Sequence, residues 1–364
     1  MIRRTLLATL ATALLAVVGC SKSEAPGGTG PGAPPPAPAG PVKLTGAGAT
    51  FPYPLYSKWM DEYRKLKPGV QINYQSIGSG GGIRQVIAGT VDFGATDAPM
   101  NDEEAKKAPH KLFHLPMTLG AVAVVYNVAE LKAPLKLTPD VLVDIYLGKI
   151  TKWNDARLKA LNEGAALPAA DIRVVSRSDG SGTTAVFTDY LGTVSPEWKE
   201  KVGVGKSVKW PVGLSAKGNE GVSGSVSTTP GSIGYAELAY ALQTGLSMAA
   251  LKSVVGEFVT PSIEAVTAAA EGVELPDSLH VSIVNSAAPK AYPISSYTYL
   301  LVYEDMPDAA KAQALSEFLW WAIHDGQKLS GTLHYAPLPA KAIGKIEARL
   351  KELKSGGKSL LGSP

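Results

Sequence analysis

Hydrophobic and polar residues follow two different periods along the chain from Val42 onward. The stretch PYPLYSKWMDEYRKL places Leu55, Trp59, Tyr63 and Leu66 on one stripe, because residues three or four apart share a helix face. The stretch VQINYQ that follows alternates apolar and polar residues, which is the period of a half-buried strand. We therefore expect a helix and then a strand, packed through their apolar sides.

The alternation of strands and helices continues through the middle of the chain. TVDFGATD, GAVAVVYNV and DIRVVSR have the pattern of strands, and GGIRQVIAG and TTAVFTDYL that of helices. LTPDVLVDIYLGKI predicts a further helix with Thr138 as N-cap, Pro139 in the first turn, and Leu142, Ile145 and Tyr146 facing inward. This order predicts an α/β protein with mostly parallel sheets.

Two aromatic-rich stretches lie near the C-terminus. In YPISSYTYLLVYED, Tyr297, Tyr299 and Leu301 alternate as on a strand, and LWWAIHDG places Trp320 and Trp321 in a late helix. Large aromatic residues in such elements most often pack in a core. We expect core positions for them and no ligand platform.

The chain opens with the pattern of an export signal, MIRRTLLATLATALLAVVGC. Arg3 and Arg4 precede an uncharged stretch over residues 5–19, which is shorter than the roughly 20 apolar residues that span a bilayer. The only cysteine, Cys20, follows Val-Val-Gly, and this resembles the lipobox of bacterial lipoproteins, in which that thiol is acylated. Residues 1–19 are therefore expected to be a lipoprotein signal peptide. A palmitate-type anchor at Cys20 is expected to hold the protein outside the cytoplasm at a membrane of the cell envelope, on its periplasmic side or its outer face. The alternative is an incidental cysteine in an apolar leader.

The segment after Cys20 is expected to be a tether. EAPGGTGPGAPPPAPAGP has no residues that could form a buried face, and its prolines and glycines oppose helices and sheets, so residues 20–41 separate the anchor from the globular part. With one cysteine the chain can form no disulfide within itself. Its core alone must hold the exported domain together.

Composition and charge exclude some classes of function. The chain has 364 residues, of which 45% are hydrophobic and 18% charged, and this is enough for a large core. Without Arg3 and Arg4 of the leader, 33 basic side chains face 32 acidic ones. A nearly neutral body favours no nucleic-acid partner. The sequence has no cluster of cysteine and histidine typical of a metal site, and we expect no cofactor.

Three loops share one arrangement: a strand ends in glycine and hydroxyl residues, and a helix begins at once. They are TGAGATFP (45–52), SIGSGGGIRQ (76–85) and RSDGSGTT (177–184). The start of a helix leaves about four backbone N–H groups unpaired and carries about half a positive charge, so it favours an anion. If the loops converge, they can surround a small tetrahedral anion. Hydroxyl donors in them are Thr50, Ser79, Ser181 and Thr183.

Charged residues narrow the kind of anion. Arg177 offers a planar fork suited to phosphate or sulfate oxygens, and Asp179 is placed to orient it. Asp97 also follows a strand, and an ionised carboxylate can only accept hydrogen bonds. It can face an anion only if that anion carries a proton, as phosphate does near pH 7 and sulfate does not. Asp97 would then discriminate between the two.

Other interpretations of these residues stay open at this point. Each glycine-rich loop can be an ordinary turn, and Asp97 can be an N-cap or an Asx-turn residue. Ser181 could be the nucleophile of an exported hydrolase of phosphate esters, although its G-S-G context lacks the G-x-S-x-G spacing and none of the five histidines lies in an evident relation to it. A receptor for another oxyanion, such as sulfate or molybdate, is a further possibility.

The motifs together resemble a known family. LTGAGATFPYPLYSKW, NYQSIGSGGGIRQVIAGTVDFGATDAPM, DIYLGKITKWND, VVSRSDGSGTTAVFTDYL, KWPVGLSAKGNEGV and PGSIGY are similar to the phosphate-binding lipoproteins of the phosphate-specific ABC transporter, the PstS family of the periplasmic-binding-protein superfamily. The similarity extends from about Leu44 to Leu338. At Gly80 the family often has a second serine, so no contact from position 80 is expected.

The resemblance implies a function and a set of ligand-binding residues. The protein would bind inorganic phosphate with high affinity outside the cytoplasm and deliver it to the membrane permease subunits of an ABC transporter, without being an enzyme. Asp97 would accept the phosphate proton, and Asp179 would brace Arg177. The phosphate-binding residues implied are Thr50, Phe51 through its amide, Ser79, Asp97, Arg177, Ser181, Gly182 and Thr183.

The resemblance also implies a two-lobed, type II periplasmic-binding-protein fold with two crossover strands near Leu119 and Ser286. The first lobe would comprise residues 42–118 and 287–354, the second lobe residues 119–286, and residues 355–364 would form a C-terminal tail. The anion would close the cleft between the lobes by a hinge motion.

Overall fold

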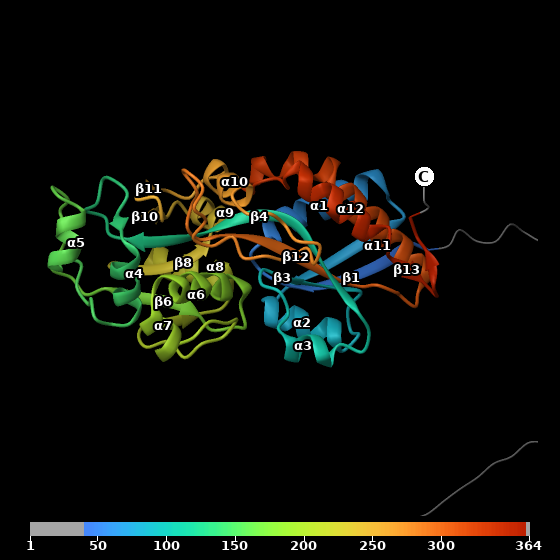
Figure 1. Ribbon diagram of the computed structural model, residues 1–364, viewed down its shortest axis with the longest axis horizontal. Helices are drawn as coiled ribbons and strands as arrows, with labels where there is room; N and C mark the ends of the chain where they lie inside the picture. The colour runs from blue at the N-terminus through green and yellow to red at the C-terminus, as the bar shows by residue number, and fades with distance from the viewer. Residues whose placement is uncertain (1–39, 362–364) are drawn as a thin grey trace, which may run out of the picture. The chain divides into compact units, whose positions relative to one another are not determined.

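A computed structural model describes residues 40–361 of the chain (Figure 1). The expected signal peptide, Cys20 and nearly all of the tether lie outside these residues. The strands are β1 (Val42–Gly48), β2 (Val70–Ser76), β3 (Phe93–Thr96), β4 (Leu112–Asn127), β5 (Lys136–Leu137), β6 (Arg173–Arg177), β7 (Leu214–Ala216), β8 (Ser232–Glu237), β9 (Ser247–Met248), β10 (Ala250–Lys252), β11 (Phe258–Val259), β12 (Ser295–Tyr303), β13 (Lys354–Ser355) and β14 (Lys358–Ser359).

Helices cover both faces of the main sheet. The α-helices are α1 (Tyr53–Leu66), α2 (Ser79–Ile87), α3 (Asp102–Lys107), α4 (Pro139–Tyr146), α5 (Ala156–Leu161), α6 (Gly182–Val194), α7 (Pro196–Lys201), α8 (Gly218–Thr228), α9 (Leu238–Gln243), α10 (Ile263–Glu271), α11 (Ala309–Ile323) and α12 (Ala340–Leu350), with 3-10 turns η1 (Asp325–Leu329) and η2 (Gly331–Leu333). The predicted α/β class is confirmed.

One mixed sheet runs through the molecule in the order β2-β1-β3-β12-β4-β8-β6-β7. The outer pairs β1–β2, β1–β3, β6–β8 and β6–β7 are parallel, but β12 and β4 lie antiparallel to their neighbours. The pattern of the sequence predicted mostly parallel sheets and did not predict the antiparallel strands β12 and β4 in the centre. The reason is that β12 returns from late in the chain to pair with β4, which a local strand-helix pattern does not reveal.

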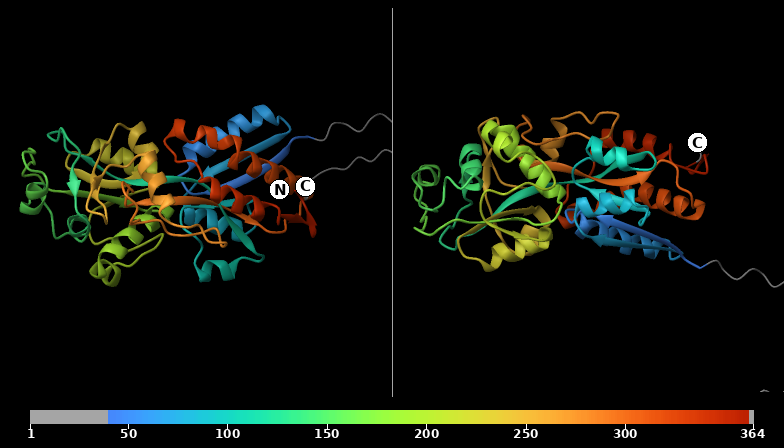
Figure 2. Two further views of the ribbon diagram at one scale, coloured as in Figure 1. Left: turned by 45° about the horizontal axis from the view of Figure 1, so that its top comes forward. Right: turned by 90° about the horizontal axis from the view of Figure 1, so that it is seen from below.

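Strand β4 joins the two halves of this sheet. Its residues 112–121 pair with β12, and its residues 122–127 pair with β8. We call the part around β1, β2, β3 and β12 the first lobe and the part around β6, β7 and β8 the second lobe. Figures 1 and 2 show them at opposite ends of β4, the first lobe in blue and red and the second in green and yellow. The exact boundaries at residues 119 and 286 stay a prediction.

Most predicted core positions are buried. Leu55, Trp59 and Tyr63 of α1 lie in the core, but Leu66 is 60% exposed, so its predicted place on the buried stripe is wrong. Leu66 is the last residue of α1, where the helix ends and the stripe no longer faces the sheet. In β12, Tyr297, Tyr299 and Leu301 are buried as predicted, whereas Trp320 and Trp321 of α11 are partly buried against the core.

Helix α4 confirms the predicted inward face, since Leu142, Ile145 and Tyr146 are fully buried. Thr138 occupies the N-cap position, but its side chain makes no capping hydrogen bond. Strand β4 begins eight residues before the predicted GAVAVVYNV stretch, at Leu112. Three strand–helix connections bring glycine-rich loops to the region between the lobes. They are β1–α1 and β2–α2 in the first lobe and β6–α6 in the second lobe.

Candidate functional site

The loop before α2 and the loop before α6 are in direct contact. The backbone N–H of Gly182 donates to Ser79 Oγ at 3.0 Å, and that of Gly80 donates to the Gly180 carbonyl at 2.8 Å. A β-carbon at Gly182 would lie 2.5 Å from both Ser79 Oγ and Asp97 Oδ2. Glycine is required there because the two lobes approach so closely.

Thr50 joins the same cluster from the loop before α1. Its Oγ1 accepts a hydrogen bond from Asn219 Nδ2 at 2.7 Å, and the same nitrogen donates to Thr183 Oγ1 at 3.2 Å. The carbonyl of Phe51 accepts a hydrogen bond from the Tyr335 hydroxyl at 2.6 Å. The structure thus brings together residues from all three predicted loops, and all of these side chains are buried.

Arg177 lies at the end of β6 with its guanidinium held by Asp179. Nε donates to Oδ1 at 2.8 Å and Nη2 to Oδ2 at 2.6 Å, while Nη1 is 3.4 Å from Thr183 Oγ1. Burial by itself would raise the pKa of Asp179, but the hydrogen bonds and charge of Arg177 outweigh this and leave it below its ordinary value. Asp179 is therefore ionised at neutral pH and fixes the plane of the fork.

Asp97 follows β3 and is almost completely buried, with 2% of the residue exposed. Burial raises its pKa to about 7, although hydrogen bonds from Thr298, Thr183 and Ser79 and the charge of Arg177 act in the opposite direction. Its Oδ1 accepts the Thr298 hydroxyl at 2.9 Å. Near neutral pH, one proton can be shared between Asp97 and an oxyanion placed beside it.

Ser181 is the N-cap residue of α6. Its Oγ accepts the backbone N–H of Thr184 at 3.1 Å, and the side chain is buried. Within residues 40–361, no histidine is hydrogen-bonded to Ser181. His114 accepts the N–H of Met100, and His324 contacts Trp320 and Glu347.

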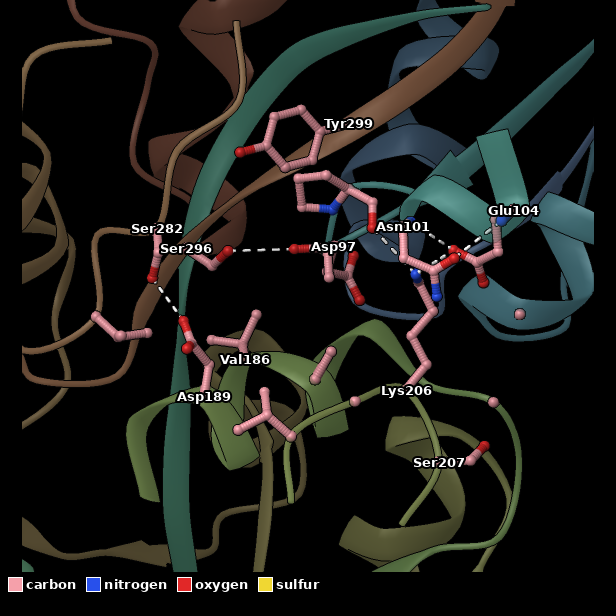
Figure 3. Close-up of a pocket in the computed structure, with 18 of the residues that line it drawn as sticks. Asp97, Asn101, Glu104, Val186, Asp189, Lys206, Ser207, Ser282, Ser296 and Tyr299 are labelled. Carbon is pink, nitrogen blue, oxygen red and sulfur yellow. Dashed lines mark hydrogen bonds and ion pairs between the residues drawn. The ribbon is translucent and has the colours of Figure 1, made fainter. Parts of the chain in front are cut away.

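A groove of about 580 Å³ lies beside the cluster, and Figure 3 shows Asp97, Ser296 and Lys206 among the side chains that line it. Gly80, Asp97 and Gly180 line it at the cluster, and Ser296 donates to the carbonyl of Asp97 at 3.3 Å. Lys206 of the second lobe also lines the groove and bridges to the first lobe, donating to Glu104 Oε2 at 2.8 Å and to the Pro99 carbonyl at 3.0 Å. The groove offers a path between solvent and Asp97.

Sequence reasoning missed several residues that support the cluster. Asn219 had a detectable signal, since LSAKGNEG is a fourth strand that ends in glycine before a helix, β7 to α8. Thr298 and Tyr335 had none, because they come from segments about 200 residues or more away in the chain from Asp97 and Phe51. The Tyr240 hydroxyl, which donates to the Thr50 carbonyl at 2.6 Å, had no signal either.

The arrangement is rich in hydrogen-bond donors and contains one fixed cation. The starts of α2 and α6 add their helix dipoles. Three N–H groups there, those of Gly80, Gly182 and Thr184, already have partners within the cluster. In the part of the chain that the structure describes, no group of three or more histidine, cysteine, aspartate or glutamate residues could hold a metal ion. Its chemistry fits the binding of a small oxyanion that carries a hydrogen.

Comparisons with known proteins agree with one another. A family model described as a PBP superfamily domain matches residues 34–325. The chain is 47% identical over 322 residues to the phosphate-binding protein PstS of Pasteurella multocida, which covers 87% of this chain and 93% of that protein. It is 46% identical to the phosphate-binding protein PstS of Xylella fastidiosa strain Temecula1, over 84% of each.

The fold agrees with solved structures as well. A high-affinity periplasmic phosphate-binding protein bound with phosphate matches with a TM-score of 0.68, at 22% identity, over 84% of this chain and 93% of that one. This likeness concerns the fold and supports the two-lobed arrangement.

Proposed function

This chain belongs to the PBP superfamily and, within it, to the phosphate-binding PstS proteins, and from that premise we propose that it binds inorganic phosphate outside the cytoplasm and delivers it to the permease of an ABC transporter for import. The observation that carries the proposal is the convergence of the glycine-rich loops around Arg177 and Asp97.

Each residue of the cluster has a role in this proposal. Arg177 and the amide of Phe51 donate to phosphate oxygens, and Asp97 accepts the phosphate hydrogen. The Gly182 N–H, which donates to Ser79 Oγ in the structure, shares its hydrogen with a phosphate oxygen in a three-centre bond. The hydroxyl donors are Thr50, Ser79, Ser181 and Thr183. Charge-assisted hydrogen bonds contribute about 1.5–3 kcal/mol each, so several of them can exceed the desolvation of the anion. A micromolar or tighter dissociation constant, about −8 kcal/mol, is a reasonable result.

The electrostatics of the cluster suit a partly protonated anion. Asp179 takes up much of the charge of Arg177 through its two short hydrogen bonds. The remaining stabilisation of a dianion falls to backbone dipoles at the starts of α2 and α6. A site built around one required hydrogen bond can reject an analogue without that hydrogen by roughly 10⁴–10⁵. Asp97 would therefore exclude sulfate.

Closure of the two lobes completes the proposal. The ligand residues come from both lobes and are buried, and Lys206 bridges the lobes beside the groove. An anion held by both lobes would favour this closed arrangement, since it makes its full set of contacts only there. We place the hinges near residues 119 and 286, with lobes of 42–118 plus 287–354 and 119–286, and expect the permease subunits to recognise the closed form.

We also propose attachment to a membrane through acylated Cys20, with residues 20–41 as tether. Among residues 40–361, the structure has no helix long and apolar enough to cross a bilayer. Several acyl chains would give lasting attachment at about 0.8 kcal/mol per buried CH₂. Replacing Cys20 by serine should move the protein from the membrane fraction to the soluble fraction. Unchanged fractionation would contradict the anchor.

Isothermal titration with phosphate, and with sulfate and molybdate as competitors, tests the proposed function. We expect binding of one phosphate per chain and little competition from the other anions. A chromogenic phosphate ester incubated with the same protein should remain intact. Turnover that depends on Ser181 would instead favour the hydrolase, and equal competition by sulfate would favour a receptor for other oxyanions.

A further inference from the structure

Asn219 occupies a central position between the two lobes although it belongs to none of the loops singled out from the sequence. It is the second residue of α8 and is completely buried. The preceding glycine has φ +75° and donates its N–H to Asp179 Oδ1 at 3.0 Å. The start of α8 is thereby tied to the residue that braces Arg177.

The orientation of the Asn219 amide follows from its partners. Oδ1 accepts the backbone N–H of Glu237 at 2.9 Å, and that N–H can only donate. The other end must therefore be the NH₂ group, and it faces two hydroxyl oxygens, Thr50 Oγ1 at 2.7 Å and Thr183 Oγ1 at 3.2 Å. One amide thus donates to hydroxyls of both lobes.

These bonds occupy the accepting capacity of the two threonines. A hydroxyl has two lone pairs and one proton. Thr50 Oγ1 accepts from the backbone N–H of Asn219 at 3.2 Å as well as from its side chain. Thr183 Oγ1 accepts from Asn219 and from Arg177 Nη1 at 3.4 Å. Each hydroxyl keeps only its proton to offer to another group.

The Ser79 hydroxyl also has both of its lone pairs occupied, by groups other than Asn219. Its Oγ accepts the N–H of Gly182 at 3.0 Å and that of Asp97 at 3.3 Å. All three hydroxyls can then donate but not accept, so a protonated ligand that lies among Thr50, Thr183 and Ser79 finds its acceptor in the carboxylate of Asp97 and not in these hydroxyls. A hydroxyl that was free to rotate could itself accept the hydrogen of a protonated ligand. Asp97 would then no longer be needed as the acceptor.

We propose that Asn219 is a positioning residue for phosphate binding: it fixes the hydroxyls of Thr50 and Thr183 as donors while it holds the two lobes together. The inference rests on the proposed function and deepens it. Asn219 acts through the two threonines and needs no contact with the anion. Its replacement should therefore matter only while those hydroxyls are present.

A double-mutant cycle on phosphate affinity, measured by isothermal titration, tests this. Asn219→Ala should raise the dissociation constant by about tenfold or more in the otherwise unchanged protein. In a Thr50→Val, Thr183→Val background, the same replacement should raise it by no more than about twofold. In a Ser79→Ala background it should again raise it about tenfold, because Asn219 does not contact Ser79.

Asn127 provides a matched control for loss of a side-chain amide. It lies at the end of β4 and donates to the carbonyls of Val226 and Ser227. Asn127→Ala should leave phosphate affinity unchanged, and thermal unfolding of all variants reports their stability.

Two results would overturn the inference. The first is that Asn219→Ala raises the dissociation constant for phosphate equally in the double-valine background, which would mean a structural role or a direct contact. The second is that Asn219→Ala leaves the dissociation constant of the otherwise unchanged protein as it was. If the unchanged protein binds no phosphate, the proposed function fails and the inference with it, so the two failures are distinguishable.

Discussion

Arg177 and Asp179, two residues apart in the chain, form a fork-to-fork pair in which Nε and Nη2 of the guanidinium donate to separate carboxylate oxygens at 2.8 and 2.6 Å. The guanidinium is almost completely buried, with 1% of the side chain exposed. Because two parallel hydrogen bonds fix one edge of the guanidinium, its plane is set before any anion arrives. The pair makes the cation a directional donor and reduces its excess charge.

The fork geometry predicts that charge alone will not replace Arg177. Arg177→Lys keeps the positive charge but cannot bond Asp179 and an anion in the same plane. We expect phosphate affinity to fall by about a hundredfold, measured by isothermal titration, which corresponds to the loss of about 2.7 kcal/mol. Arg173→Lys, at the exposed start of the same strand, is the matched control and should bind normally. Near-native binding by Arg177→Lys would place the anion elsewhere.

Asp97 is expected to set selectivity. Asp97→Asn replaces an acceptor by a group that can also donate, so sulfate should no longer meet a repelling carboxylate. Competition titrations should show the preference for phosphate over sulfate falling by at least about a hundredfold. Asp92→Asn is the control, since Asp92 lies just before the same strand and bonds Thr45 and Lys311 instead. Unchanged selectivity in Asp97→Asn would remove Asp97 from this role.

The raised pKa of Asp97 predicts a pH dependence of stability in phosphate-free buffer. The folded protein keeps this proton up to about pH 7, whereas the unfolded chain releases it near its ordinary pKa of 3.8. The folded state binds more protons in that interval, so the free energy of unfolding should fall as the pH rises from about 4 to 7.

Urea unfolding of the Asp97→Asn variant isolates this contribution. The variant should lose less stability than the unchanged protein between pH 4.5 and pH 7, because its side chain does not titrate. Glu237, whose pKa is raised by burial and also by the charge of Asp97, is present in both proteins, so it enters the difference only through its coupling to Asp97. Parallel pH profiles for the two proteins would show that Asp97 does not titrate in this range.

Gly182 is expected to tolerate no side chain. A methyl group there would meet Ser79 Oγ and Asp97 Oδ2, so Gly182→Ala must push the lobes apart. Phosphate affinity should fall by about a hundredfold or more while the fold is retained, as judged by circular dichroism. Gly224→Ala in α8 has open space around it and should bind phosphate normally. Normal binding by Gly182→Ala would mean that the close approach of the loops is not needed.

The local elements could be predicted from sequence because their signals are local. The stripe of Leu55, Trp59 and Tyr63 and the alternation in VQINYQ depend on residues a few positions apart. The end of the stripe at Leu66 failed because periodicity does not tell where a helix leaves its sheet. The antiparallel pairing of β12 with β4 failed because it joins segments that are far apart in the chain.

In the candidate site, too, the features with a local sequence signal could be predicted and those that depend on distant segments could not. Arg177 and Asp179 are two residues apart, so their pairing could be foreseen, and the glycine-rich loops had a common pattern. The groups that orient the ligand residues could not be foreseen, because Thr298 and Tyr335 reach Asp97 and Phe51 only through the fold. The burial that raises the pKa of Asp97 also depends on the closed arrangement of both lobes.

The most direct test of the central claim is a crystal structure of the protein grown with phosphate and without sulfate. We expect one phosphate enclosed by the loops before α1, α2 and α6, with two oxygens facing Arg177 and a third within hydrogen-bond distance of Asp97. Phosphate bound only at surface lysines, with these loops in contact with no anion, would contradict it.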